Sequence, residues 1–249
     1  MDQLKEWDLS GKCALITADS RGWTPFFAEA LAEAGADIVL VGDDIEQINK
    51  SRNVIKSYGR ASMIHLIDLT SYEDIQSVVS KTLTEFGKID ILVNNAQSDF
   101  SKPFLQVSND EWKNIMSYNI DSVVMFSKEV GKHMVANNYG RIININSIAG
   151  VRGMWNSTLK CASRGAISQL TSSLGLEWAE FGVRVNGIGA GWINTSSSDS
   201  DDVLNRYLPS RRIGHPTDLC GLLVYLASEA CDFVTGTTIN IDGGALAHA

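Results

Sequence analysis

The chain has 249 residues, of which 44% are hydrophobic and 20% are charged, and its formal net charge is −8. These values are typical of a globular protein and exclude a fibrous or low-complexity chain. The acidic balance argues against a nucleic-acid partner, because a nucleic-acid surface needs basic side chains to neutralise phosphates.

Short β-branched runs alternate with segments of helical period along the whole chain. In chain order, the predicted strands are 13–17, 37–41, 62–66, 89–94, 141–145, 184–188 and 238–241. The predicted helices are 26–34, 45–58, 72–86, 111–135, 158–181 and 217–227. Strands separated by helices indicate βαβ crossovers and a parallel sheet covered on both faces. We therefore predict one α/β domain over residues 1–249, a Rossmann-type doubly wound sheet of about seven strands.

Residues 189–216 form the longest irregular stretch, and its segment 196–202 consists of Ser and Asp residues. In a doubly wound fold, ligands bind at the carboxyl ends of the strands. This stretch is therefore either a lid over a ligand site or an ordinary solvated loop, and the sequence leaves both open.

The cysteines and the first residues indicate a cytoplasmic protein. The four cysteines, Cys13, Cys161, Cys220 and Cys231, include no C-x-x-C pair, which predicts reduced thiols and no metal site. The start lacks a basic segment followed by an apolar core, and no apolar run approaches the roughly 18–20 residues of a membrane span. We expect no membrane partner.

Seven short blocks resemble the short-chain dehydrogenase/reductase family over nearly the whole chain. They are LSGK at 9–12, DLT at 68–70, NNA at 94–96, Asn119, INS at 145–147, FGVRVN at 181–186, and TG at 235–236 with DGG at 242–244. The resemblance implies a Rossmann fold and descent from oxidoreductases that use a nicotinamide dinucleotide. Shared descent does not by itself imply shared activity.

The glycine-rich cofactor loop of that family is altered here. The family pattern Thr-Gly-x-x-x-Gly-x-Gly corresponds to residues 17–24, TADSRGWT, in which only Gly22 remains. Ala18 adds a Cβ where the turn is expected to need a positive φ. Trp23 is expected either to fill the space of the pyrophosphate or to pack with neighbouring aromatic residues.

The start of the next helix is altered as well. Thr24 followed by Pro25 predicts an N-cap with proline at the first helical position. Proline also removes one amide donor from a helix terminus that would otherwise bind an anion.

Other positions that bind the cofactor in the resembled family are partly kept. Gln97 replaces a glycine and would crowd the adenosine side, and Ala190 replaces a proline. Asp43 would accept a hydrogen bond from a ribose hydroxyl and repel a 2′-phosphate, which favours NAD over NADP. The vestigial cofactor positions are predicted to be Gly22, Asp43, Asp68, Asn94 and Thr195.

The catalytic positions show the same loss. The resemblance places Asn119 and Ser147 at retained family positions, while Lys160 and Arg164 stand where the family has its acid/base tyrosine and its lysine. Arginine does not reproduce a lysine point charge. Two like charges at i and i+4 also repel by about 0.2–0.5 kcal/mol unless an anion joins them.

These losses favour a non-catalytic subunit that supports an active NAD-dependent paralogue, whose substrate could be a 3-hydroxyacyl-CoA-type alcohol, in a hetero-oligomer such as a tetramer. This hypothesis expects no cofactor bound by the chain itself. One alternative is a cofactor-free enzyme in which Lys160 and Arg164 act, with Lys160 as an amine nucleophile. A second alternative is an NAD-dependent alcohol or ketone oxidoreductase with an atypical site.

Overall fold

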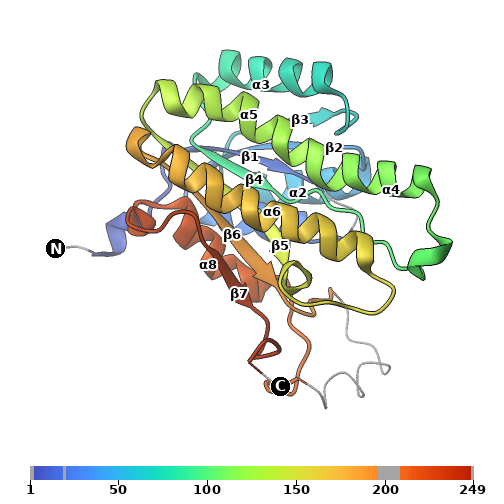
Figure 1. The fold of residues 1–249 in the computed structure, drawn as a ribbon. Helices are drawn as coiled ribbons and strands as arrows, with labels where there is room; N and C mark the ends of the chain where they lie inside the picture. Colours follow the sequence, from blue (N-terminus) through green and yellow to red (C-terminus); the bar gives the residue numbers. More distant parts are fainter. Residues whose placement is uncertain (1–2, 19–20, 196–207, 248–249) are drawn as a thin grey trace.

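The computed structural model describes residues 3–18, 21–195 and 208–247, except for the side chains of Gln3, Leu4 and Gln47, and shows one sheet of parallel strands between two layers of helices (Figure 1). The strand order is β3-β2-β1-β4-β5-β6-β7. The strands are β1 (Cys13–Thr17), β2 (Asp37–Gly42), β3 (Ser62–Leu66), β4 (Ile91–Asn94), β5 (Gly140–Ser147), β6 (Val183–Ala190) and β7 (Thr238–Ile241). The predicted doubly wound sheet of seven strands is therefore confirmed.

The helices between the strands agree with the predicted order but differ at two places. They are α1 (Thr24–Glu33), α2 (Ile45–Ser57), α3 (Tyr72–Phe86), α4 (Asn109–Met116), α5 (Ser122–Ala136), α6 (Thr158–Glu177) and α8 (Thr217–Ala227). Within the described part of the chain, no helix is long and apolar enough to cross a membrane.

The single helix predicted over 111–135 was wrong in one respect. A π-helical turn, Ser117–Asp121, separates α4 from α5 and contains Asn119. The predicted helix 158–181 ends earlier, at Glu177, and a short 3-10 helix follows over Ala179–Phe181. Gly182 ends this turn because its φ of +69° is a left-handed conformation that glycine tolerates well.

Strands β5 and β6 are longer at both ends than the predicted strands 141–145 and 184–188. Ser147 and Ala190 are paired at the carboxyl ends of these two strands. The irregular stretch predicted from residue 189 therefore begins only after Ala190. Residues 196–207 of the predicted stretch, including its Ser and Asp segment, lie outside the described residues.

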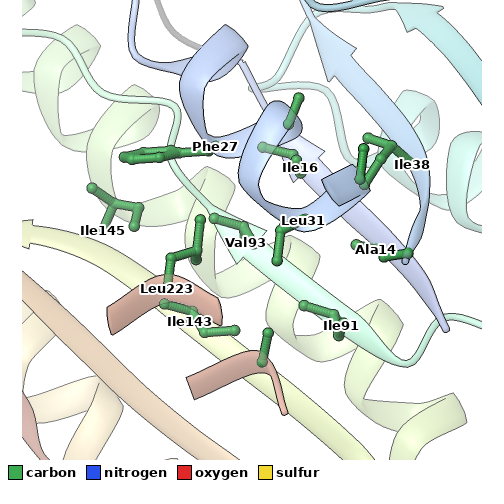
Figure 2. Close-up of a cluster of buried hydrophobic side chains, with 14 of the residues drawn as sticks. Ala14, Ile16, Phe27, Leu31, Ile38, Ile91, Val93, Ile143, Ile145 and Leu223 are labelled. Atoms are coloured by element: carbon green, nitrogen blue, oxygen red, sulfur yellow. The ribbon is translucent and has the colours of Figure 1, made fainter. Parts of the chain in front are cut away.

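Both faces of the sheet are buried, so the central strands β1 and β4 are almost wholly apolar. Alternate residues of β1 point to opposite sides: Ala14 and Ile16 pack beneath α1 and α8, while Leu15 packs toward α3 and α5. Figure 2 shows the first cluster, in which Phe27 and Leu31 of α1 lie over the sheet. Burial on both faces is what a parallel sheet with helical crossovers requires.

Buried polar side chains join the strand ends next to the cleft. Thr17 Oγ1 accepts hydrogen bonds from the amides of Asn95 and Ala96, each at 2.9 Å. The Asn94 side chain donates to Asn144 Oδ1 at 2.8 Å and to Ser127 Oγ at 3.1 Å. These bonds fasten the ends of β1, β4 and β5 to one another, at the point where the strand order reverses and ligands of this fold bind.

Helix α6, which carries Lys160 and Arg164, approaches the chain before β7 unusually closely. A Cβ added at Gly175 would lie 2.4 Å from the backbone of Gly236. We predict that Gly175→Ala lowers the free energy of unfolding by about 1–3 kcal/mol, because this backbone cannot give way as a side chain would. Urea denaturation measures the change.

Gly221→Ala in α8 is the matched control, because nothing lies within 4 Å of its added Cβ. We expect it to raise the free energy of unfolding by about 0.4–1 kcal/mol. Equal effects at Gly175 and Gly221 would contradict the close approach.

Candidate active site

A cavity of about 430 Å³ lies at the carboxyl ends of β4, β5 and β6, beside the turn that follows β1. Its position, next to the reversal of strand order between β1 and β4, is where ligands bind in doubly wound folds. Its lining residues are Arg21, Trp23, Gln97, Asp99, Asn146, Ser147, Lys160, Ala190, Gly191, Trp192, Ile193, Asn194, Thr195 and Ile213. The cavity is the candidate active site.

Ser147 and Lys160 both line this cavity, as the sequence predicted for catalytic positions. Ser147 is the last residue of β5, and its Oγ accepts from the amide of Ala149 at 3.2 Å. Lys160 comes from the first turn of α6.

Asn119 is fully buried behind the cavity wall and is not one of its lining residues. Its amide group forms two hydrogen bonds with the backbone of Ser98, one from Ser98 N at 2.8 Å and one to Ser98 O at 2.9 Å. Asn119 therefore fixes the loop that follows β4.

Asp99 is the residue beyond Ser98 in this loop, and sequence reasoning missed it. Its Oδ1 lies 2.9 Å from Lys160 Nζ. Burial alone would raise the pKa of Asp99, but the adjacent Lys160 ammonium, with Arg21 and Arg164 nearby, holds it below the ordinary aspartate value. The available signal was its position just after a strand, at the end of the sheet where ligands bind.

Arg164 lies one helical turn after Lys160 and is 1% exposed. Its backbone carbonyl accepts from Asn146 Nδ2 at 3.1 Å, and a Cβ at Gly150 would lie 2.9 Å from the same oxygen. These contacts press the start of α6 against the end of β5. The predicted repulsion between Lys160 and Arg164 is relieved here, because the carboxylate of Asp99 attracts both cations.

The ion pair also bears on the alternative of a cofactor-free enzyme. An amine nucleophile must be neutral to attack a carbonyl carbon. Lys160 Nζ instead lies 2.9 Å from a carboxylate oxygen of Asp99, with which it forms an ion pair. The geometry therefore gives no support to a covalent role for Lys160.

The turn after β1 differs from what the sequence predicted at two positions. Ala18 was expected to need a positive φ, but it is not among the described residues with that conformation, which Gly22 adopts at +82°. Thr24 was expected to cap α1, but Trp23 is the capping residue and Thr24 is the first helical one. Thr24 Oγ1 instead accepts from Asn95 Nδ2 at 3.1 Å, because it is buried against the loop after β4.

Of the two interpretations of Trp23, packing is confirmed. Its side chain is 6% exposed, and its ring meets that of Phe27 edge to face at 6.4 Å. Arg21 lies over the same ring at 3.8 Å and donates to the carbonyl and side-chain oxygens of Asn95, each at 3.1 Å. Arg21, a second residue that sequence reasoning missed, is thereby held at the cavity wall.

Gln97 does not extend toward solvent. It is 2% exposed, and its amide nitrogen donates to the carbonyl of Ile145 in β5. Its Oε1, like Oδ1 of Asn146, is buried without a hydrogen-bond partner among the described residues. Both side chains line the cavity, although these two oxygens are themselves buried.

The remaining predicted cofactor residues are dispersed. Thr195 lines the cavity, whereas Asn94 lies in the core with its amide engaged by Asn144 and Ser127. Asp43 is exposed directly after β2. Asp68 is exposed and accepts from Thr70 N and Oγ1 at 2.8 and 2.7 Å, hydrogen bonds that lower the pKa of Asp68. Among the described residues, no group of three or more His, Cys, Asp or Glu side chains could hold a metal ion.

Comparison with known proteins gives related sequences and structures along nearly the full length. Residues 17–245 match the model of a family described as enoyl-(acyl carrier protein) reductase. The 2-dehydro-3-deoxy-D-gluconate 5-dehydrogenase of Escherichia coli (strain K12) is 35% identical, with 98% of this chain and 99% of the relative covered. The gluconate 5-dehydrogenase of Gluconobacter oxydans (strain 621H) is 30% identical, with 96% of each chain covered.

A similar solved structure is that of a gluconate 5-dehydrogenase from Burkholderia cenocepacia J2315 in complex with NADP and tartrate. It superposes with a TM-score of 0.92 at 32% identity and covers 99% of both chains.

These findings overturn the expectation of a non-catalytic subunit, because the relatives are named as dehydrogenases. The expectation that the chain binds no dinucleotide, and would prefer NAD to NADP, is overturned as well, since the relative of known structure holds NADP. The altered loop does not close the site, because Trp23 packs against Phe27 and forms part of the wall of a cavity that remains beside Ser147 and Lys160.

We predict that Lys160→Met raises the pKa of the Asp99 carboxyl, because the nearest cation is removed while burial remains. In the native protein, the ionised carboxyl stabilises the fold above the ordinary aspartate range, and this contribution is lost as pH falls through the lowered pKa. Carbon-detected NMR titration of the Asp99 carboxyl measures the change.

Asp68 serves as the internal control, because its pKa is lowered by hydrogen bonds from Thr70 that the substitution leaves in place. An Asp99 titration that is the same in both proteins would contradict the ion pair.

Proposed function

The chain belongs to the short-chain dehydrogenase/reductase family, and from this premise we propose that it is an NAD(P)-dependent oxidoreductase that interconverts a secondary alcohol and a ketone of a sugar acid. The names of the relatives support both the reaction and the class of substrate, since gluconate and 2-dehydro-3-deoxy-D-gluconate are polyhydroxy carboxylates. The NADP and tartrate of the B. cenocepacia structure support the cofactor and a carboxylate ligand.

The observation that carries this proposal is the charge of the cavity. Among the described residues that line the cavity, Arg21 and Lys160 are cationic and Asp99 is the one acidic residue, so cations outnumber anions there in a chain whose net charge is −8. A local positive excess in an acidic protein favours anionic ligands and concentrates them at the site. A sugar-acid carboxylate and a dinucleotide pyrophosphate are both ligands of this charge.

The residues present fit a nicotinamide dinucleotide. Gly22 keeps its left-handed backbone at the turn after β1, and Trp23 is packed into the core. Gln97 and Asn146 add polar side chains to the cavity wall. When bound, the nicotinamide would supply or accept the hydride.

The chain's own residues would position the substrate and move the proton. Lys160 stands at the acid/base position, and its Nζ is the group that would donate a proton to a ketone oxygen. The Ser147 hydroxyl lines the same cavity and would orient that oxygen through a hydrogen bond. Arg21 would attract the carboxylate of the substrate to the other side of the cavity.

We predict that the purified chain oxidises reduced NAD(P) in the presence of a keto sugar acid, which the loss of nicotinamide absorbance measures. Lys160→Met should lower kcat by about 10²–10⁴-fold, the usual contribution of a positioned acid. Lys113→Met, at an exposed lysine of α4, is the matched control and should leave kcat unchanged. Absence of turnover and of dinucleotide binding in a fluorescence titration would refute the proposed function.

We also propose that the chain assembles with a second short-chain dehydrogenase chain, as the sequence led us to expect. Strand β7 forms an edge of the sheet, and Phe233 and Leu176 are exposed large apolar side chains. Exposed apolar side chains beside a sheet edge are typical of an interface. Native mass spectrometry of the untagged protein should show an oligomer that contains a second sequence; a monomer or a homo-oligomer would contradict this proposal.

A further inference from the structure

Asp99 is the one acidic residue among the described residues that line the cavity, and the proposed reaction has so far given it no role. Its side chain is 50% exposed, even though its Oδ1 lies 2.9 Å from Lys160 Nζ. An ionised carboxylate has two oxygens, with room for about four hydrogen bonds. The ion pair therefore leaves part of this carboxylate open to a ligand in the cavity.

The loop that carries Asp99 is held on both sides of this residue. Before it, the side chain of Asn119 forms hydrogen bonds with both Ser98 N and Ser98 O. After it, Lys102 N donates to Asn156 O at 2.7 Å, which joins this loop to the one that precedes α6. The carboxylate is therefore presented at a fixed place, and a preorganised group loses little conformational freedom when it binds a ligand.

A carboxylate at this wall would oppose the binding of a ligand that is only an anion. Arg21 and Lys160 attract a ligand carboxylate, whereas Asp99 repels it. Although burial raises the pKa of Asp99, the Lys160 ammonium holds it below the ordinary aspartate value, so the group is ionised at neutral pH and only accepts hydrogen bonds. Its partner on a ligand must be a donor, and the donors of a sugar acid are its hydroxyl groups.

We propose that Asp99 is a specificity-determining residue that accepts a hydrogen bond from a hydroxyl group of the substrate, so that the site selects polyhydroxy acids over acids of the same length without hydroxyl groups. This inference rests on the proposed function and deepens it by naming the residue that recognises the hydroxyl groups. Because Lys160 Nζ lies beside the same carboxylate, a substrate oxygen that contacts Nζ and a hydroxyl on the neighbouring carbon can reach both groups at once.

Asp99 is better placed for this role than the acceptors near it. The side-chain oxygens of Gln97 and Asn146 are buried, and Ser147 Oγ already accepts from Ala149 N at 3.2 Å. A hydrogen bond to an ionised acceptor is also roughly twice as strong as one between neutral groups. Recognition of a hydroxyl at this wall is therefore expected to depend on the carboxylate.

The first test measures binding and does not depend on turnover. D-Gluconate and hexanoate are acids of the same chain length that differ only in their hydroxyl groups, so Arg21 and Lys160 attract both. Calorimetric titration in the presence of reduced NADP, with which neither acid can react, gives the two dissociation constants. The native protein should prefer gluconate, and Asp99→Ala should reduce this preference by about 10–100-fold, the effect of losing one hydrogen bond to a charged acceptor.

Two further variants complete this test. Asp99→Asn keeps the shape of the side chain and a neutral acceptor, so it should reduce the preference severalfold, and it replaces Asp99→Ala if the alanine variant does not fold. Asp110→Ala, at an exposed carboxylate in the first turn of α4, is the matched control and should leave the preference unchanged.

The second test compares the reduction of two ketones with the same carbon chain. 5-Keto-D-gluconate carries hydroxyl groups beside its ketone, and 5-oxohexanoate carries none. Asp99→Ala should lower kcat/KM for 5-keto-D-gluconate about 10–100-fold more than for 5-oxohexanoate. A purely structural role, through the ion pair with Lys160, would lower both values alike and leave their ratio unaltered.

The two tests separate failure of the inference from failure of the proposed function. A native protein that binds gluconate no more tightly than hexanoate, or a native preference that persists in the Asp99 variants, would overturn the inference even if both ketones are reduced. A native protein that reduces neither ketone would refute the proposed function, and the two dissociation constants would then still decide whether Asp99 recognises hydroxyl groups.

Discussion

The burial of the parallel sheet on both faces is the constraint on which the rest of this structure depends. It requires apolar residues at successive positions of β1, β2 and β4, whose polar residues lie at the strand ends. The ends of β1, β4 and β5 are then held together by hydrogen bonds, such as those that Thr17 accepts from the loop after β4. The cavity exists because these ends meet where the strand order reverses.

The electrostatics of the cavity follow from this arrangement. Among the described residues, Arg21, Lys160 and the half-exposed Asp99 are the charged side chains of the cavity wall, and Arg164 is buried nearby. Asp99 reduces the repulsion between Lys160 and Arg164 without cancelling the positive excess. A site of this kind attracts anionic ligands.

The loss of family motif residues therefore did not show whether the cofactor site is obstructed. Trp23 suggested an obstructed cofactor loop, but a large aromatic side chain is stabilised by burial, and the core beneath α1 had room for it. Ala18 likewise needed no left-handed backbone, because Gly22 supplies that conformation. A motif records which residues relatives use, whereas obstruction depends on where each side chain packs.

The sequence by itself determined the order and type of the elements, with the exact bounds of β1, β3, α3, α8 and β7, because hydrophobic period and helix-terminating residues act locally. It also placed Ser147 and Lys160 at the site through their distances from recognisable blocks. Only the tertiary structure decided that Asp99 and Arg21 join them, and that Asn119 acts through the backbone of Ser98. These contacts join loops that are distant in the chain, and they arise from side-chain packing and charge pairing, neither of which leaves a periodic pattern in the sequence.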